Sequence, residues 1–378
     1  MIFHRQSLLG LGRHISGRGN RYLRAFDRYG GIPLVLALAG IRRRRSQPSA
    51  LRMIGVLNTA AIGDTILMGA ALADLRAAYP QANLIAFSGR GNAEAVELLE
   101  GLDTRVTLSL ENLGASVRQL RKYHLDLLFD FGPWPRINAL LSALADADFT
   151  IGFRTARQYR HYAYDLAVEH RNDVHELENY RSLVRAIGLD AWNLPSLNWC
   201  LPEPSIRQDE RSFVFHLWPG GRHAELKEWP LERWAQLAGE LVVESHSIIL
   251  TGAPGQFVAN ENLIAMIDPA LRSHFHNAAG LSLGATASLL AQANLVVSVN
   301  TGIMHLAAAL GVPLIALHGP TSVRRWGPLG PKTVALESPC RGCGYLDLGF
   351  EYHDKPRYCM SAISYRMVRE ACARVLNS

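Results

Sequence analysis

The candidate catalytic and ligand-binding side chains lie in turn segments that follow short apolar runs. The first is NTAAIGD (58–64), which ends in a single carboxylate. A carboxylate between a buried strand and a helix can act as a general base toward a substrate hydroxyl. Asp64 can equally serve as the N-cap of that helix, because its side chain accepts hydrogen bonds from free backbone N–H groups. Asp64 is therefore a candidate catalytic residue with a structural alternative.

The second segment, PGGRHAELKEWP (219–230), combines glycines with positive charge. Gly220 and Gly221 let backbone N–H groups approach an anion, and Arg222 and Lys227 supply cations. The alternative is a glycine-rich turn with solvated basic side chains.

The third segment, SVNTGIMH (298–305), is the strongest candidate for an anion site. A buried strand meets a helix at Thr301 and Gly302, and the free N–H groups and dipole of that helix suit a pyrophosphate. His305, one turn into the helix, either reaches the same anion or is a core histidine. A fourth segment, LHGPTSVRRWGP (317–328), is expected to face the same cleft.

Alternating apolar runs and helical stretches predict the elements that position these segments. We expect a parallel, doubly wound sheet with helices on both faces, followed by a second unit of the same kind. Strands are predicted at 52–58, 83–87, 105–108 and 125–131, with helices at 64–79, 92–100, 113–123 and 136–145. After a proline-containing connection at 194–208, strands are predicted at 212–218, 247–251, 295–299 and 313–318, with helices at 231–243, 283–293 and 304–310.

The predicted organisation is an N-terminal extension, two domains and a final helix. Their expected ranges are 1–50, 51–200, 209–360 and 361–378. Two α/β domains in series place a ligand cleft between them, at the carboxyl ends of both sheets. A two-domain dehydrogenase and a twin-Rossmann glycosyltransferase both fit. A dinucleotide-binding site needs the motif G-x-G-x-x-G in the first loop, where only Gly63 is present. The sequence therefore argues against a dehydrogenase.

Composition narrows the class of protein. With 378 residues, 48% of them hydrophobic, the chain is expected to fold into packed globular domains rather than a disordered or fibrous structure. No apolar run approaches the roughly 20 residues that span a bilayer. Five cysteines are an odd number, which favours a reducing, intracellular compartment over a disulfide scaffold.

The first 50 residues differ from the rest in charge. They contain ten arginines and one acid, a net charge of +9, so residues 51–378 carry −3 of the overall +6. Such a segment either lies on an anionic membrane surface or packs its apolar stripe on the protein's own body. Nothing in the body supports nucleic-acid binding. The apolar residues at helical spacing are Leu8, Leu11, Ile15, Tyr22, Phe26 and Tyr29.

Four blocks in this order resemble glycosyltransferase family 9, the bacterial heptosyltransferases of lipopolysaccharide core assembly. They are NTAAIGDTILMGAALADLRAAYPQANL (58–84), WPGGRHAELKEWPLERW (218–234), VSVNTGIMHLAAALGVPLIALHGPTSVRRWGPLG (297–330) and the cysteine-containing stretch 338–363. The resemblance implies a GT-B fold and metal-independent inverting transfer, with no cofactor. It also implies an ADP-L-glycero-β-D-manno-heptose donor and a lipopolysaccharide-core or other glycan or glycolipid acceptor. Taken with the basic extension, it predicts a cytoplasmic enzyme that is peripheral on the inner face of the cytoplasmic membrane.

The resemblance also implies roles for individual residues. Asp64 matches the family's catalytic aspartate and Lys227 the lysine that holds donor phosphate. Thr301, Gly302 and His305 match the pyrophosphate-binding turn. Arg222 is expected to assist with the phosphates, Gly220 and Gly221 to line the donor site, and Thr59, Arg136 and Arg154 to lie on the acceptor side.

Two positions depart from the family pattern. Asn300 stands where an aspartate usually contacts the donor sugar, and Gln256 stands where an acid usually binds the ribose. These departures leave open a catalytically silent nucleotide-sugar-binding protein on the same scaffold.

The sequence contains two candidate metal sites. Asp146-Ala147-Asp148 has the Asp-x-Asp form of metal-dependent transferases, but its expected place is away from the donor pocket. A zinc site with three cysteines and one histidine is the second, with weak support from its spacing. Its ligands would be Cys340, Cys343, Cys359 and His353.

Overall fold

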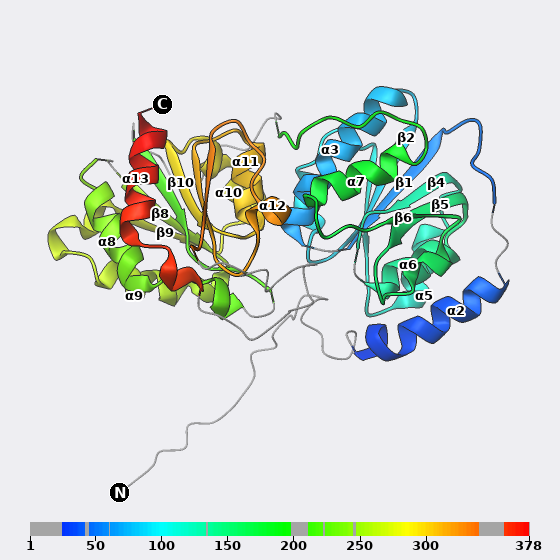
Figure 1. Cartoon of the computed structure of the whole chain (residues 1–378), viewed down its shortest axis with the longest axis horizontal. Helices are drawn as coiled ribbons and strands as arrows, with labels where there is room; N and C mark the ends of the chain where they lie inside the picture. The colour runs from blue at the N-terminus through cyan, green and yellow to red at the C-terminus, as the bar shows by residue number, and fades with distance from the viewer. Residues whose placement is uncertain are drawn as a thin grey trace, which may run out of the picture.

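The computed structural model of the chain contains two parallel sheets of six strands each (Figure 1). It describes residues 25–41, 45–59, 61–133, 135–197, 211–221, 224–244, 247–339 and 359–377. The strand orders are β3-β2-β1-β4-β5-β6 and β12-β11-β10-β7-β8-β9. Both follow the doubly wound order 3-2-1-4-5-6 when each sheet is numbered from its own first strand. The predicted fold class, two Rossmann-like units, is confirmed.

The first sheet has three helices of moderate length and several short ones around it. Its strands are β1 (Met53–Asn58), β2 (Asn83–Gly89), β3 (Thr104–Leu108), β4 (Leu125–Asp130), β5 (Ala147–Arg154) and β6 (Leu166–Glu169). Its helices are α3 (Ile62–Ala78), α4 (Ala93–Glu97), α5 (Leu113–Leu120), α6 (Arg136–Leu144), η3 (Arg160–Ala163) and α7 (Glu176–Arg185).

The second sheet repeats the pattern and ends in a helix that packs beside α8. Its strands are β7 (Ser212–His216), β8 (Ser247–Gly252), β9 (Phe275–Ala279), β10 (Leu295–Val299), β11 (Leu314–His318) and β12 (Thr333–Glu337). Its helices are η4 (Ala224–Lys227), α8 (Leu231–Leu241), η5 (Pro254–Gln256), α9 (Phe257–Ala265), η6 (Pro269–His274), α10 (Leu283–Ala291), α11 (Gly302–Ala309), α12 (Val323–Trp326), η7 (Cys359–Ala362) and α13 (Tyr365–Leu376).

The central strands are buried on both faces, which is why they read as continuous apolar runs. In β1, five of six residues are buried, and every residue of β7, β10 and β11 is buried. The strand order reverses between β1 and β4 in one sheet and between β7 and β10 in the other. Ligands of such sheets bind outside the carboxyl ends of the strands at these reversal points.

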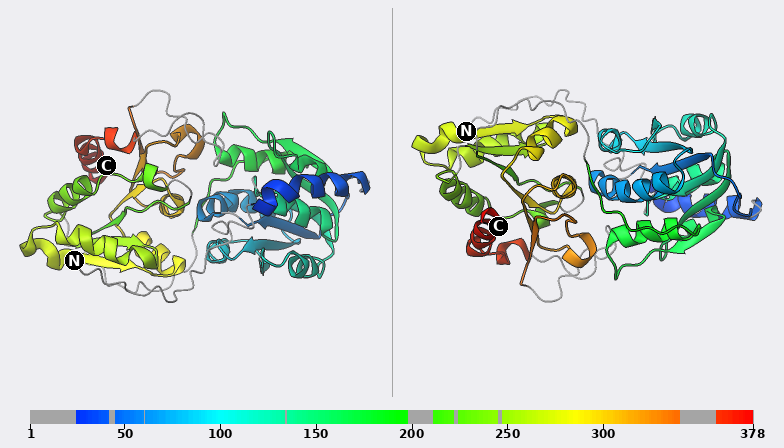
Figure 2. Two further views of the ribbon diagram at one scale, coloured as in Figure 1. Left: turned by 90° about the horizontal axis from the view of Figure 1, so that it is seen from below. Right: turned by 90° about the horizontal axis from the view of Figure 1, so that it is seen from above.

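The two units lie side by side and share an apolar cluster (Figure 2). Helices α3 and α4 of the first unit contact α11 and α10 of the second. One oxygen of Glu94 accepts a 2.6 Å hydrogen bond from the backbone N–H of Leu283, at the start of α10. The carboxyl ends of both sheets therefore face a common boundary.

Part of the N-terminal extension packs on the first unit. A π-helical turn, η2 (Phe26–Gly30), leads into α2 (Gly31–Ile41), which lies outside α6 (Figure 1). The predicted stripe from Leu8 to Tyr22 lies outside the described residues. Tyr29, at its end, is 74% exposed rather than packed. In the described part of the chain, no helix is both long and apolar enough to cross a membrane.

Candidate functional site at the meeting of two helix N-termini

Helix α3 begins two residues earlier than the sequence pattern predicts. It starts at Ile62 with Ala61 as its N-cap, and Ala61 makes no side-chain cap hydrogen bond. Asp64 therefore lies within the first turn of α3. The alternative prediction, that Asp64 is the N-cap of this helix, is wrong. The carboxylate side chain follows β1 at the reversal point of the first sheet, and the residue is 8% exposed.

Asn92 braces the loop that carries Asp64. Its side-chain amide donates 2.8 Å hydrogen bonds to the Asn58 carbonyl and to Thr65 Oγ1. Its Oδ1 accepts from the backbone N–H of Gly89 at 2.9 Å. Asn92 joins the loop after β1 to the loop after β2, and sequence reasoning placed it only at a predicted helix start.

The N-terminus of α11 lies directly against that of α3. A Cβ added to Gly302 would lie 2.7 Å from Ile62 Cβ, closer than real Cβ atoms come to such a neighbour, and 3.0 Å from the Gly63 nitrogen, which is also tight. A Cβ added to Gly63 would lie 2.8 Å from the Cδ2 of His305. Two glycines thus let the two backbones touch. Asp64 is next to this contact on one side, and Thr301, the N-cap of α11, is next to it on the other.

Both helix N-termini carry partial positive charge from their aligned peptide dipoles. The side chain of Thr301 accepts a 3.4 Å hydrogen bond from Met304 N–H, which satisfies one backbone donor of α11. The dipoles and the remaining first-turn N–H groups make the meeting point attractive to an anion.

Three histidines of this region are held neutral. Burial, together with His175 and His318 nearby, lowers the pKa of His305 to about 3. Burial also lowers the pKa of His318 to about 3 and depresses that of His175. The Nδ1 atom of His305 and the Nε2 atom of His318 are buried without a hydrogen-bond partner. A neutral imidazole can donate one hydrogen bond to a ligand oxygen without adding a charge.

Asn300 is oriented by its neighbours. Its side-chain amide lies 3.1 Å from His318 Nδ1 and donates to Thr321 Oγ1 at 2.8 Å. Because Asn300 donates, His318 Nδ1 must accept and its proton sits on Nε2. This orientation leaves the carbonyl oxygen of Asn300 as the acceptor for a ligand.

The glycine-rich loop after β7 lies beside the α11 turn, because β7 and β10 are neighbouring parallel strands. Gly221 has a φ of +87°, a conformation that glycine adopts without strain. Lys227 Nζ donates a 2.8 Å hydrogen bond to the Gly220 carbonyl, and this bond holds the ammonium group against the glycine-rich loop. Arg222 lies outside the described residues. Gln256 Oε1 accepts from Ala253 N–H at 2.7 Å and closes the turn after β8.

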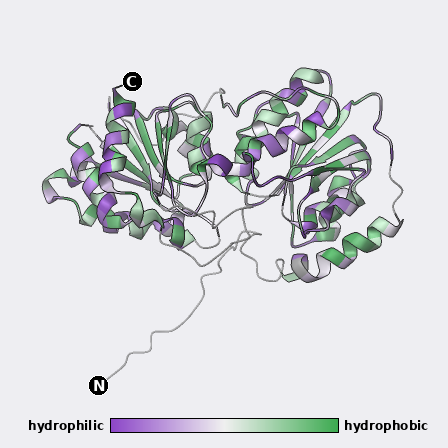
Figure 3. Ribbon diagram, in the orientation of Figure 1, coloured by the Kyte–Doolittle hydropathy of each residue, from purple (hydrophilic) through white to green (hydrophobic). Residues whose placement is uncertain are grey.

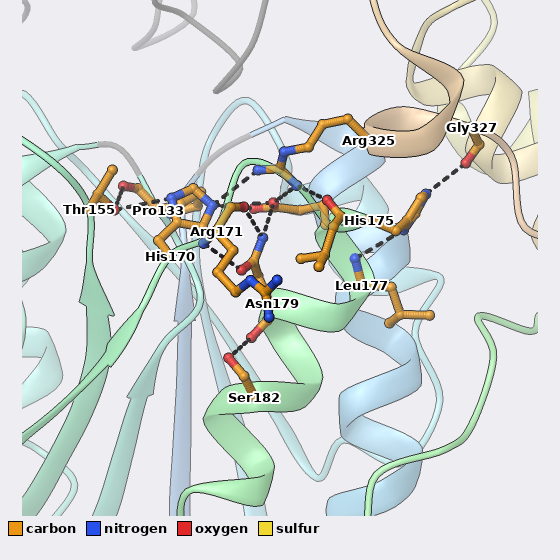
Figure 4. Close-up of polar contacts among 12 residues, drawn as sticks. Pro133, Thr155, His170, Arg171, His175, Leu177, Asn179, Ser182, Arg325 and Gly327 are labelled. Carbon is orange, nitrogen blue, oxygen red and sulfur yellow. Dashed lines mark hydrogen bonds and ion pairs between the residues drawn. The ribbon is translucent and has the colours of Figure 1, made fainter.

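A buried ionic network joins the two units beside these helices (Figure 4). Arg325 of α12 forms an ion pair with Glu176 of α7, and its Nη2 lies 3.2 Å from His170 Nε2. Burial alone would raise the pKa of Glu176, but His170 and Arg325 outweigh it and lower that pKa to about 2. His175 Nε2 lies 2.9 Å from the Gly327 carbonyl across the same boundary. Sequence reasoning missed this network, although the segment 317–328 was noted.

The residues predicted for the acceptor side have different surroundings. Thr59 is buried and donates to Asn138 Oδ1 at 2.6 Å. Arg136 is also buried, and its Nε donates to the Gln158 carbonyl at 3.0 Å. Arg154 is exposed at the end of β5. Of the three, Arg154 alone presents its side chain to solvent.

The structure describes both aspartates of the candidate Asp-x-Asp metal site but only one ligand of the candidate zinc site. Asp146 and Asp148 lie at the start of β5, the edge opposite the helix N-termini, and both are within 4 Å of His124. Cys340, Cys343 and His353 of the suggested zinc site lie outside the described residues. Cys359 is disulfide-bonded, which removes its thiolate as a ligand. Within the described ranges no group of three or more metal-ligating side chains occurs.

Comparisons with known proteins agree with this architecture. The sequence profile of glycosyltransferase family 9 (heptosyltransferase) matches residues 115–344, more than half of the chain. The chain belongs to glycosyltransferase family 9. The matched range begins after α4, so Asp64 lies outside it, and its candidacy rests on position in the fold.

Relatives and solved structures of family 9 show how far the similarity extends. Lipopolysaccharide heptosyltransferase 2 of Escherichia coli K12 is 28% identical over 42% of this chain and 50% of its own length. The chain thus spans about a third to a half of the curated relatives that it matches. The structure of E. coli ADP-heptose lps heptosyltransferase II covers 86% of this chain and 99% of its own, at 21% identity and a TM-score of 0.72. E. coli heptosyltransferase WaaC with ADP covers 85% and 99%, at 21% identity and a TM-score of 0.67.

The buried histidines of this family 9 chain predict an acid-sensitive fold. Because the folded pKa values of His305 and His318 lie below the ordinary 6.5, the unfolded chain binds protons that the native chain does not. Stability is therefore full above about pH 6.5 and is lost as the pH falls toward 3. We expect each histidine to cost about 1 kcal/mol per pH unit in that window.

Urea unfolding at pH 7 and pH 5 measures this effect. The His318→Gln variant, which keeps a polar side chain but cannot titrate, should show a smaller difference between the two pH values. An equal difference in variant and parent would contradict the assignment.

Proposed function

We propose that the chain is an inverting glycosyltransferase that moves a heptose, or a related sugar, from a nucleotide diphosphate to a glycolipid hydroxyl. ADP-heptose is the proposed donor and the lipopolysaccharide core the proposed acceptor. Family membership supports the reaction class, and the names of the similar E. coli proteins, with their ADP and heptose, support the donor. The observation that supports the proposal is the close approach of Gly63 to Gly302 and His305, because Asp64 follows Gly63 and Thr301 precedes Gly302 in the sequence.

In the proposed reaction Asp64 takes the proton of the acceptor hydroxyl. The freed oxygen attacks the anomeric carbon from the side opposite the diphosphate, and the bond between that carbon and the phosphate oxygen breaks. The nucleoside diphosphate leaves with the bonding electron pair, which places an additional negative charge on its terminal phosphate.

Donors on the second unit would stabilise that charge. The first-turn N–H groups of α11 with Thr301 and Gly302, the neutral ring of His305 and the ammonium of Lys227 are the proposed partners of the diphosphate. Arg222 is proposed to assist from the same loop. These groups would fill the role that a divalent metal has in other transferases, so we propose a metal-independent reaction.

The carbonyl oxygen of Asn300 is proposed to accept a hydrogen bond from a sugar hydroxyl. The asparagine lacks the charge of the family's usual aspartate but retains an acceptor in a defined orientation. Binding of the donor sugar is therefore retained in this proposal, and family membership supports an active enzyme over a silent binding protein. Gln256, Gly220 and Gly221 are proposed to line the nucleotide side.

The test is transfer by the purified full chain from ADP-heptose to lipopolysaccharide of a strain that lacks core heptose. Release of ADP and a matching gain in acceptor mass are expected, with less than a tenth of the rate from GDP- or UDP-sugars. Excess EDTA should leave the rate unchanged. Loss of transfer with EDTA would contradict the metal-independent reaction, and absence of transfer from every donor would contradict the function.

A further inference from the structure

Helix α2 presents an apolar surface away from the protein body. Its sequence, GIPLVLALAGI, contains no polar side chain over 11 residues. Val35 is fully buried against Leu140 and Tyr164, while Leu34 and Leu36 on the flanks of the helix are each 43% exposed. A helix that is apolar all round normally has a partner on every side. The outer half of α2 has none within the described part of the chain (Figure 3).

The helix is held firmly in place. Asp27, just before α2, accepts a 2.9 Å hydrogen bond from Ile137 N–H at the start of α6. Arg136 lies 3.4 Å from the same carboxylate and also donates to the Gln158 carbonyl at 3.0 Å. These contacts join the extension to α6 and to the loop before η3.

Aromatic side chains lie on η2 and η3, which both contact α2. Tyr29, Tyr159 and Tyr162 are 74%, 45% and 43% exposed. Arg157 and Tyr159 both have a φ of 59°, a left-handed conformation that is uncommon for such residues. Tyrosine suits a boundary where one end of the side chain is apolar and the other wet. We call Leu34, Leu36, Tyr29, Tyr159 and Tyr162 the α2 surface.

The sequence on either side of α2 is rich in positive charge. Residues 1–50 contain ten arginines, four of which follow α2 directly, and Asp27 is their single acid. The carboxylate of Asp27 is paired with the body of the protein. Arg45, the last of the four arginines after α2, is paired with Asp165 of the body. Arg157 adds an exposed cation beside Tyr159.

We propose that the α2 surface docks the protein on an anionic phospholipid bilayer. Leu34 and Leu36 enter the boundary between headgroups and acyl chains, the tyrosines lie at headgroup level, and the arginines bind lipid phosphates. The pattern is that of a helix lying in the plane of the membrane. The proposal does not depend on the transfer chemistry, because no residue of the α2 surface takes part in the proposed reaction.

Vesicle co-sedimentation of the full chain tests the proposal. Binding is expected to vesicles of phosphatidylglycerol and phosphatidylethanolamine, and at least tenfold weaker binding to phosphatidylcholine alone. The double variant Leu34→Glu with Leu36→Glu should bind the anionic vesicles at least tenfold more weakly than the parent. Melting temperature and ADP binding report whether the variant is folded, and Leu34→Gln with Leu36→Gln replaces it if it is not.

The matched control is Val243→Glu with Val258→Glu. These two valines are 77% and 69% exposed on the second unit and should leave vesicle binding unchanged. Parent-like binding by both α2 variants would overturn the proposal, since the arginines alone would then suffice. Equal binding to both lipid mixtures would overturn it too, as would an α2-dependent dimer that binds no vesicles.

Discussion

Asp64→Asn is expected to lower the transfer rate by about 10² to 10⁴-fold, the usual contribution of a positioned general base. The amide has the size of the carboxylate but cannot accept the proton of the acceptor hydroxyl. Because the amide also keeps the hydrogen-bonding capacity of the side chain in the first turn of α3, the fold and ADP binding should persist. The rate under donor saturation measures the first effect, and ADP titration by calorimetry measures the second.

The matched control for this prediction is Asp148→Asn, at the opposite edge of the first sheet. Its rate should equal that of the parent, because no metal-binding Asp-x-Asp pair is expected to act there. If Asp64→Asn kept the parent's rate, the proton would have to leave by another route, and the proposed mechanism would be wrong.

Arg325→Ala is expected to have the largest effect on stability, about 3–5 kcal/mol. It removes one of the two charged partners of Glu176, whose side chain is fully buried, and leaves only His170 as a charged partner of that carboxylate. The midpoint of thermal unfolding should fall. Because the ion pair joins the two units, small-angle scattering should show a larger radius of gyration for the variant.

Two variants distinguish this cost from a general weakness of the region. Arg325→Met combined with Glu176→Leu removes both charges and should recover most of the lost stability. Arg171→Ala removes an exposed ion pair with Asp173 and should leave the midpoint unchanged. No recovery in the double variant would mean that Arg325 stabilises the boundary by packing rather than by charge.

The fold was predictable because its central strands are buried on both faces and their apolar runs are continuous. Edge elements were harder to predict. Strand β6 (LAVE) has no fully buried residue, and β12 is mostly half-buried, so neither shows a strong apolar pattern. Neither strand was predicted. The start of α3 was missed by two residues, because Ala61 caps it without a side-chain hydrogen bond.

Individual site segments were predictable, but their mutual contacts were not. A glycine before Asp64 and a glycine after Thr301 are visible in the sequence. That each one makes room for the other's backbone follows only from the packing of α3 on α11. The pairing of Glu176 with Arg325 is likewise invisible, because the two residues lie on different units and no spacing rule connects them.

The backbone contact between positions 63 and 302 makes those two positions mutually dependent. An alanine at position 302 would place its methyl group in space occupied by Ile62, and an alanine at position 63 would place it in space occupied by His305. Neither neighbour could yield without shifting a helix start. Engineering of substrate preference in this protein should therefore keep both glycines and vary the surrounding loops, where a new side chain does not separate the two units.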